Sequence, residues 1–353
     1  MPRKLKIAQV GTYPPPAGGR SIHMRNLAQK LCSSGNKVTV FDTQPDVGEP
    51  DHTSAKYIGR RVDFRLLWIL LFNGYDIVHV HFTSWRFQAV LAVLSKFRKT
   101  RVIYTLHSFR DELDVASGWK RFLIKTSLSY AYRIICINED IRKKVFSIAP
   151  DAICEVVSPF IFYRETVSQR SLPPKVKSFM ENKTFAVVAC ASATTKLEGV
   201  DLYGLDMIID LAAFFKKKKI SVSIVVIITD VTNRDYFNSL NNKIIEQEVG
   251  EIVMLYEGRV DFNQLLKISD LFVRPTTSDS FGLSLADAHI CGVHCIASDV
   301  CERPTGTLVY KSRNQIDFNF KCINTLLGEV SSVPNVDLSN YDGFARIQEL
   351  YTK

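Results

Sequence analysis

The feature that most constrains the fold is an alternation of short β-branched runs with amphipathic stretches, which occurs twice along the 353 residues. The first series contains runs such as KLKIAQV, KVTVFDT and RVIYTLH, separated by stretches whose apolar residues have helical spacing. The second series extends from TFAVVACAS to HCIAS. Strands that alternate with helices form a parallel sheet covered on both faces. The sequence therefore predicts two such sheets.

A polar stretch between Ser158 and Pro174 separates the two series and is typical of a linker. The chain is also longer than the roughly 150 residues that one domain usually contains. We therefore predict an α/β protein with two doubly wound, Rossmann-like domains, at residues 1–165 and 175–340, that face a central cleft. Ligands of such sheets bind at the carboxyl ends of the strands.

The charge of the chain is unevenly distributed. Residues 1–160 contain 24 Lys and Arg against 13 Asp and Glu, a balance of +11, which leaves −2 for the remainder. Such a field attracts anionic lipid head groups, phosphorylated acceptors or nucleic acid. The alternative is a solvated basic face with no partner. We expect no nucleic acid as a partner, and we expect the apolar run Leu66–Phe72 to pack against the sheet while the charges around it contact an anionic membrane.

Cysteine usage and the N-terminus indicate the compartment. Most of the eight cysteines lie in apolar runs, which suits a reducing environment. The N-terminal MPRKLKIAQV passes directly from basic residues into a strand pattern, without the apolar core of a signal peptide. The longest apolar run is far shorter than the about 20 residues that span a bilayer. We expect a cytoplasmic protein that touches the inner face of the membrane without crossing it.

The strand LFVRP is followed by a polar loop and by a helix expected to begin near Gly282. Free amides from Ser280 to Leu283 would lie at the helix N-terminus, where an anion is favoured, so we predict a phosphorylated ligand there. Asp279 precedes this helix and Asp287 lies within it, and carboxylates accept hydrogen bonds from sugar and ribose hydroxyls. The alternative is that Asp279 caps the helix and Asp287 is a solvated helix residue.

The stretch SDSFGLSLADAHICGVHCIASD resembles the signature of glycosyltransferase family 4, a group of retaining enzymes with the GT-B fold. The usual form of that signature is Glu-Gly-Phe-Gly-Leu-Pro-x-x-Glu-Ala-x-x-x-Gly, and its two glutamates correspond to Asp279 and Asp287 at the same spacing. The resemblance implies that Asp279 lies beside the donor sugar and its phosphates and that Asp287 binds the ribose hydroxyls. It also implies that the amides of Phe281 and Gly282 contact the diphosphate or the sugar.

Other segments resemble the same family. In PPPAGGRSIHMRNLAQKL, Gly18 and Gly19 would let the backbone approach the donor. The segment YTLHSF places His107 where family members carry a histidine near the transferring sugar, and EIVMLYEGRV resembles the segment around the base pocket, which includes Arg259. The histidines of DIVHVHF also match a family strand. For each of these histidines the alternative is a structural imidazole with satisfied hydrogen bonds.

The second domain departs from the family at its cations. Family members usually place an Arg after the first strand of this domain and a Lys before the Gly of the next helix, and both neutralise the leaving diphosphate. Here Tyr203 stands before Gly204. The nearest cation is Lys196, which either reaches the diphosphate from a longer loop or is a surface lysine. Both acids are also one methylene shorter than the family glutamates.

The cysteine and histidine pattern does not predict a metal site. Five such residues fall close together, but without the paired spacing of a zinc site, and there is no Asp-x-Asp triplet that could hold Mn²⁺ or Mg²⁺; these five are His289, Cys291, His294, Cys295 and Cys301. We therefore expect no metal and no cofactor, with a UDP- or GDP-sugar as the donor substrate and a diphosphate stabilised by amides and cations.

By resemblance, the expected activity is that of a metal-independent, retaining, hexosyltransferase-type glycosyltransferase. It would move a sugar from a nucleotide sugar to a hydroxyl of a glycan or lipid-linked acceptor, in polysaccharide or glycolipid biosynthesis. Residues 1–165 would bind the acceptor, 175–340 the donor, and a helix at 341–353 would cross back to the first domain. The alternative is a non-catalytic GT-B scaffold or donor-binding subunit. An oxidoreductase is disfavoured because VGTYPPPAGG lacks the Gly-x-Gly-x-x-Gly pattern.

Overall fold

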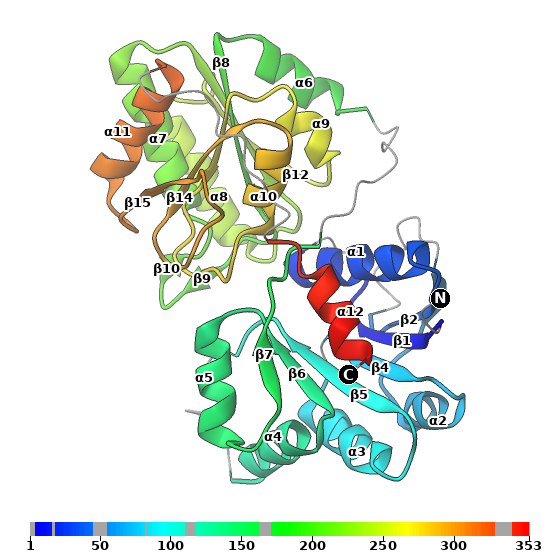
Figure 1. The fold of residues 1–353 in the computed structure, drawn as a ribbon. Coiled ribbons are helices and arrows are strands. Elements are labelled where there is room, and N and C mark those ends of the chain that lie inside the picture. Colours follow the sequence, from blue (N-terminus) through cyan, green and yellow to red (C-terminus); the bar gives the residue numbers. More distant parts are fainter. Residues whose placement is uncertain are drawn as a thin grey trace. The chain divides into compact units, whose positions relative to one another are not determined.

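The computed structural model describes residues 4–15, 18–44, 55–81, 83–109, 118–161, 171–328 and 341–352 (Figure 1). The chain divides into two compact units. Unit 1 comprises Met1–Arg164 together with Tyr341–Lys353, and unit 2 comprises Glu165–Asn340. The α/β class with two doubly wound parallel sheets, predicted from the sequence, is confirmed.

Unit 1 contains a seven-stranded parallel sheet in the order β3-β2-β1-β4-β5-β6-β7. The chain order reverses between β1 and β4, which makes this pair the topological switch point where doubly wound sheets bind ligands. Its elements are β1 (Lys6–Gly11), α1 (Gly19–Ser33), β2 (Lys37–Asp42), β3 (Lys56–Gly59), α2 (Phe64–Phe72), β4 (Ile77–Val80), α3 (Trp85–Ser95), β5 (Arg101–Leu106), α4 (Gly118–Tyr130), β6 (Arg133–Cys136), α5 (Glu139–Ile148), β7 (Cys154–Val156) and α12 (Phe344–Thr352).

The strands of unit 1 are buried on both faces. Ala8 and Val10 of β1 pack into one apolar cluster, which also contains Leu66 of α2, while Ile7 packs into a second cluster with Met24 of α1. Alternate residues of one strand thus feed two cores, which explains why these strands appear in the sequence as continuous apolar runs. The expectation that Leu66–Phe72 packs against the sheet is confirmed on the buried side of α2.

The C-terminal helix α12 belongs to unit 1, where Figure 1 shows it in red beside the sheet. Ile347 and Tyr351 are fully buried in the same cluster as Met24. The chain reaches this position through Gly343, whose amide donates to the carbonyl of Phe160 at 2.9 Å. A Cβ on Gly343 would lie 2.2 Å from the carbonyl oxygen of Ser158, so the close approach requires glycine.

Unit 2 contains a six-stranded parallel sheet in the order β12-β11-β8-β13-β14-β15, and a separate two-stranded antiparallel ribbon, β10-β9. Its switch point lies between β8 and β13. The elements are α6 (Pro174–Glu181), β8 (Phe185–Ala191), β9 (Lys196–Leu197), β10 (Val200–Asp201), α7 (Leu205–Lys218), β11 (Val222–Ile228), α8 (Arg234–Glu246), β12 (Val253–Glu257), α9 (Phe262–Leu266), β13 (Leu271–Arg274), α10 (Leu283–Ile290), β14 (His294–Ser298), β15 (Leu308–Tyr310) and α11 (Gln315–Leu326).

Hydropathy sets the sheet of unit 2 as well. All seven residues of β11, VSIVVII, are buried, as expected for a central strand covered by helices on both faces. Within the described ranges, no helix combines the length and the apolar character that crossing a membrane would require.

Candidate functional site

The loop that follows β13 lies at the switch point of unit 2, beside the carboxyl end of β8. It leads into α10, which begins at Leu283, one residue after the predicted start. Gly282 adopts a left-handed conformation with φ 84° at this junction. A Cβ there would approach Leu285 Cδ1 to 2.9 Å and Arg303 Nη1 to 3.1 Å. Both the turn and the packing therefore require glycine.

Asp279 is held in this loop by two arginines. Its Oδ2 lies 2.6 Å from Arg274 Nε and 2.7 Å from Arg303 Nη1, and its Oδ1 accepts the amide of Ser280 at 2.9 Å. The carboxylate side chain is 10% exposed. Burial alone would raise its pKa, but the two guanidinium groups outweigh this and hold the pKa of Asp279 below its usual range. Asp279 does not cap α10, so that alternative is wrong.

The two arginines differ in how much of their hydrogen-bonding capacity the protein uses. Arg303, with 2% of its side chain exposed, bonds through Nε and Nη2 to the carbonyl and hydroxyl of Ser298 and through Nη2 to the hydroxyl of Thr276, in addition to Asp279. Arg274, 14% exposed, donates from Nε to Asp279 and from Nη1 to Ser284 Oγ at 3.1 Å. Arg303 is therefore a structural group, whereas Arg274 has further N–H donors that no described residue accepts.

Asp287 lies on the second turn of α10 and is half-buried. Asp279 lies in the loop that follows β13, and that loop leads into α10, which carries Asp287. The two predicted acids thus lie on one loop–helix segment at the switch point of unit 2. Of the predicted amides, that of Ser280 is already engaged by Asp279, and Phe281 is buried.

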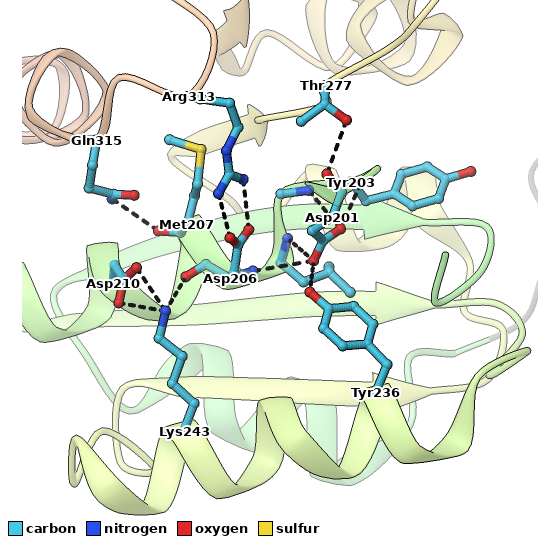
Figure 2. A network of polar contacts seen from close by, with 12 residues as sticks. Asp201, Tyr203, Asp206, Met207, Asp210, Tyr236, Lys243, Thr277, Arg313 and Gln315 are labelled. Carbon is cyan, nitrogen blue, oxygen red and sulfur yellow. Dashed lines mark hydrogen bonds and ion pairs between the residues drawn. The ribbon is translucent and has the colours of Figure 1, made fainter. Parts of the chain in front are cut away.

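The start of α7, the other helix that leaves the switch point, is occupied by the carboxylate of Asp201 (Figure 2). This carboxylate accepts the amides of Tyr203, Gly204 and Leu205 at 2.8–3.0 Å and the hydroxyl of Tyr236 at 2.5 Å. Burial raises the pKa of Asp201 and its hydrogen bonds oppose that shift. The amides at this helix end are therefore satisfied from within the protein.

The predicted cations Lys196 and Arg259 lie elsewhere in unit 2. Lys196, on β9, is exposed, and its Nζ lies 4.2 Å from the ring centroid of Tyr236. Arg259 is exposed just beyond β12, and no described residue pairs with it. Neither residue contacts Asp279, whose ion pairs are made by Arg274 and Arg303.

At the switch point of unit 1, three histidines from three elements converge: His23 of α1, His81 after β4 and His107 after β5. Their ring nitrogens lie within 4.8 Å of one another, and His81 Nδ1 is 3.5 Å from His107 Nε2. Among the described residues, this is the one group of His, Cys, Asp and Glu with the spacing to ligate a metal ion. A cavity of about 20 Å³, large enough for one water molecule, adjoins His81 and His107.

These imidazoles are neutral. Burial lowers the pKa of His23 to about 4, and burial together with the neighbouring histidines lowers the pKa of His81 and of His107 well below the usual value. His23 Nδ1 lies 2.6 Å from the carbonyl oxygen of Pro159, so Nδ1 carries the proton and Nε2 a lone pair. His23 Nε2 and His81 Nε2 are buried without a partner in the part of the chain that the structure describes.

His79, on β4 two residues before His81, has both ring nitrogens engaged. Its Nδ1 and Nε2 lie 2.6 Å from the hydroxyls of Tyr351 and Thr105, respectively. It is a structural imidazole.

The predicted glycines lie a few residues before His23, at the start of α1, where Gly18 is the N-cap and Gly19 the first helical residue. Among the described residues, no atom lies within 4 Å of a Cβ placed on Gly18.

The cysteine and histidine group near α10 does not converge on one point. His289 Nε2 lies 2.9 Å from Thr307 Oγ1, and Cys295 is buried with its thiol directed to the carbonyl oxygens of Leu285 and Val293. These side chains serve packing and local hydrogen bonds.

Sequence reasoning missed Arg274, Arg303, Asp201 and His23. A charged residue at the end of the apolar strand LFVRP was the available signal for Arg274, because a buried strand rarely ends in an arginine without a partner or ligand. Arg303 and Asp201 act through contacts with distant segments, which no local pattern reveals.

Comparisons with known proteins agree with this architecture. The family described as Glycosyltransferase Family 4 matches residues 17–161, and the family described as Glycosyl transferases group 1 matches residues 199–308. A glycosyltransferase from Rickettsia africae superposes with a TM-score of 0.72 at 12% identity, covering 99% of this chain and 98% of its own. HepE from Anabaena, in complex with UDP and glucose, superposes with a TM-score of 0.71 at 15% identity, covering 99% and 100%.

A curated relative is the uncharacterised 41.2 kDa protein in the cps region of Klebsiella pneumoniae. It is 23% identical over 270 residues, which is 70% of this chain and 69% of that protein.

Proposed function

Because the chain belongs to the group 1 glycosyltransferases, we propose that it transfers a sugar from a nucleotide-sugar donor to a hydroxyl of a glycan or lipid-linked acceptor in polysaccharide or glycolipid biosynthesis. Unit 2 binds the donor and unit 1 the acceptor. The observation that carries this proposal is the ion pair of Asp279 with Arg274 at the switch point of unit 2, in the loop that leads into the helix with Asp287. A UDP-sugar is the first donor to test, since the similar HepE was crystallised with UDP and glucose.

The roles of the acids follow from their surroundings. Asp279 is fixed by two arginines, so it orients the loop and one guanidinium as well as accepting hydrogen bonds from the sugar. Asp287, half-buried on the next turn of α10, binds the ribose hydroxyls. In unit 2, the amides of Phe281, Gly282 and Leu283 contact the diphosphate or the sugar of the donor. In unit 1, Gly18 and Gly19 are assigned to the approach of the backbone to the donor. We assign Lys196 and Arg259 to the outer parts of the donor site in unit 2, because both side chains are exposed.

Transfer proceeds with retention and without a metal. The leaving diphosphate is stabilised by guanidinium and amide groups, which act electrostatically and need no ion. His107 contacts the transferring sugar as a neutral imidazole, because burial and its neighbours keep its pKa low. A chelator should therefore leave turnover unchanged. Loss of turnover with EDTA and recovery with Zn²⁺ would instead assign a catalytic role to the cluster of His23, His81 and His107.

Unit 1 also has a surface suited to a membrane-linked acceptor. Helices α2 and α4, and the segment just after α3, expose large aromatic side chains interleaved with basic ones. Phe97 is 80% exposed, Trp68 stacks on Phe72, and the guanidinium of Arg98 lies 3.9 Å from the ring centroid of Phe72. Aromatic rings at the head-group level and basic side chains around them bind anionic bilayers. We assign this surface to peripheral contact with an anionic membrane.

Two experiments test the proposal. Thermal denaturation with a panel of UDP- and GDP-sugars identifies the donor, and the matching transfer assay then separates an enzyme from a non-catalytic donor-binding subunit, which would bind without releasing product.

Membrane contact is tested by sedimentation with lipid vesicles. The protein should sediment with vesicles that contain phosphatidylglycerol and stay in solution with phosphatidylcholine alone. Trp119→Ser with Phe122→Ser on α4 should weaken sedimentation, and Ile316→Ser, an exposed apolar residue of unit 2, should not.

A further inference from the structure

We propose that Arg274 is the cation that binds the diphosphate of the donor in unit 2. This inference rests on the proposed function, because it assigns a residue to the diphosphate of the same donor. It concerns only residues of unit 2, so it does not depend on how the two units are placed.

The first step is that α7 cannot bind this diphosphate with its N-terminus. Asp201 already accepts the first amides of that helix, and Tyr236 donates to the same carboxylate. A second anion would meet a buried negative charge and find no open amide. Tyr203, the residue before this turn, contributes a neutral hydroxyl that bonds to Ser192, and Figure 2 shows its ring pointing away from Asp201.

The second step is the position of Arg274. Arg274 is the last residue of β13, which pairs with β8 at the switch point, where doubly wound sheets bind their ligands. The next residue, Pro275, packs against the turn before α7, since a Cβ on Gly204 would lie 2.2 Å from the carbonyl oxygen of Pro275. That turn contains Tyr203, where the family pattern has a lysine.

The third step is that the guanidinium of Arg274 is held in a fixed orientation and still has unused hydrogen-bond donors. Asp279 holds Nε and Ser284 holds one edge of Nη1. Nη2 has no acceptor among the described residues, and it is not one of the polar atoms that are sealed from solvent without a partner. A planar fork with one side fixed and the other open is preorganised to bind two phosphate oxygens.

The fourth step is the charge. Asp279 neutralises only one of the two guanidinium groups that share it. Arg303 is buried and all its nitrogens are engaged, so Arg274 is the one of the two guanidinium groups with donors available to a phosphate. In the transfer reaction, negative charge grows on the diphosphate as the glycosidic bond to the sugar breaks. A guanidinium fixed beside it favours that step.

The test is calorimetry of the full-length protein with UDP, GDP and the corresponding nucleosides. Arg274→Gln should weaken diphosphate binding by about tenfold to a hundredfold, the usual worth of a charge-assisted hydrogen bond, and leave nucleoside binding unchanged. Lys216→Gln, which removes a surface cation and its pair with Glu248, is the matched control and should change neither. Adding Tyr203→Lys to Arg274→Gln should restore much of the lost affinity, because it supplies a cation from the neighbouring position.

Equal affinity of Arg274→Gln and wild type for the diphosphate would overturn this inference while leaving the proposed function standing. An equal loss for diphosphate and nucleoside would also overturn it, since it would reflect damage to the site as a whole. Should Arg274→Gln fail to fold, Arg274→Lys keeps the charge and the salt dependence of diphosphate binding, and a salt-independent affinity in that variant would contradict the role. If the wild type binds no nucleoside diphosphate, the proposed function and this inference both fail.

Discussion

The two switch points of this protein have the same topology and opposite chemistry. In unit 1 the space beyond β1 and β4 is lined by neutral imidazoles, with nitrogens that lack a partner among the described residues. In unit 2 the space beyond β8 and β13 holds two arginines around one carboxylate, with a second acid nearby. A neutral polar surface suits a sugar or hydroxyl acceptor, and a charged one suits a diphosphate. The difference therefore lies in side chains and not in the fold.

The sharpest way to break this comparison is Asp279→Asn. The change leaves two largely buried guanidinium groups without a counter-ion, and removal of one partner of such a pair costs about 3 kcal/mol of unfolding free energy. We expect that loss in urea denaturation, together with a decrease in turnover of more than about a hundredfold. Asp206→Asn is the matched control, since its pair with Arg313 is more exposed and contributes at most about 1 kcal/mol. Equal effects of the two changes would contradict the account.

The next largest effect is expected at the histidines of unit 1. His107→Ala should lower turnover by about a hundredfold, because it removes a positioned hydrogen-bonding group near the sugar. Affinity for the nucleoside diphosphate, measured by calorimetry, should not change, since that ligand is assigned to unit 2. His294→Ala, a half-buried histidine of unit 2, serves as the control. A selective loss of diphosphate affinity in the His107 variant would contradict the assignment of the diphosphate to unit 2 alone.

A smaller effect is expected from Asp287→Ala. Loss of a carboxylate that accepts ribose hydroxyls should weaken binding of UDP or GDP by about tenfold. The specific readout is the 2′-deoxy nucleotide. The wild type should prefer UDP over 2′-deoxy-UDP, and the variant should lose this preference. A preference that survives in the variant would assign the ribose to another residue.

The last prediction concerns stability as a function of pH. The pKa of His23 is lowered to about 4, against about 6.5 in the unfolded chain, so between these values the unfolded state binds a proton that the folded state excludes. Stability should therefore fall as the pH drops from about 6.5 towards 4. Asp279 behaves differently, because its lowered pKa keeps its contribution intact until the pH falls below about 4.

Urea denaturation at pH 7 and pH 5 checks this prediction. His23→Gln should reduce the loss between the two conditions, by up to about 1.4 kcal/mol per pH unit, the value for one proton. Other histidines with lowered pKa, including His79 and His289, should keep part of the slope in this variant. An unchanged slope would show that His23 is protonated equally in both states.

The fold was predictable because its determinants are local. A strand such as β11 is an unbroken apolar run, and the alternation with helical periodicity needs no tertiary information. The loop and helix around Asp279 and Asp287 were predictable for a similar reason, since both acids lie within one short segment. Their surroundings were not. Arg303 reaches Asp279 from 24 residues further along the chain, and it can do so only once β14 has been placed beside β13.

The contacts at the start of α7 could not be predicted from the sequence for a similar reason. The sequence predicted the cation at Lys196, because this residue lies only seven positions before Tyr203 along the chain. In the structure, Asp201 accepts the amides of the helix end and Lys196 lies over the ring of Tyr236, while Arg274 comes from β13, whose next residue packs against Gly204. A residue that acts across a sheet edge leaves no signal in the spacing of the sequence.

The most direct test of the central claim is hydrogen exchange of the full-length protein with and without a saturating nucleoside diphosphate, UDP first. The account predicts protection concentrated in the peptides that cover Arg274 to Asp287, with little change around His107. Protection confined to unit 1, or a bound nucleotide that leaves the segment from Arg274 to Asp287 unprotected, would contradict it.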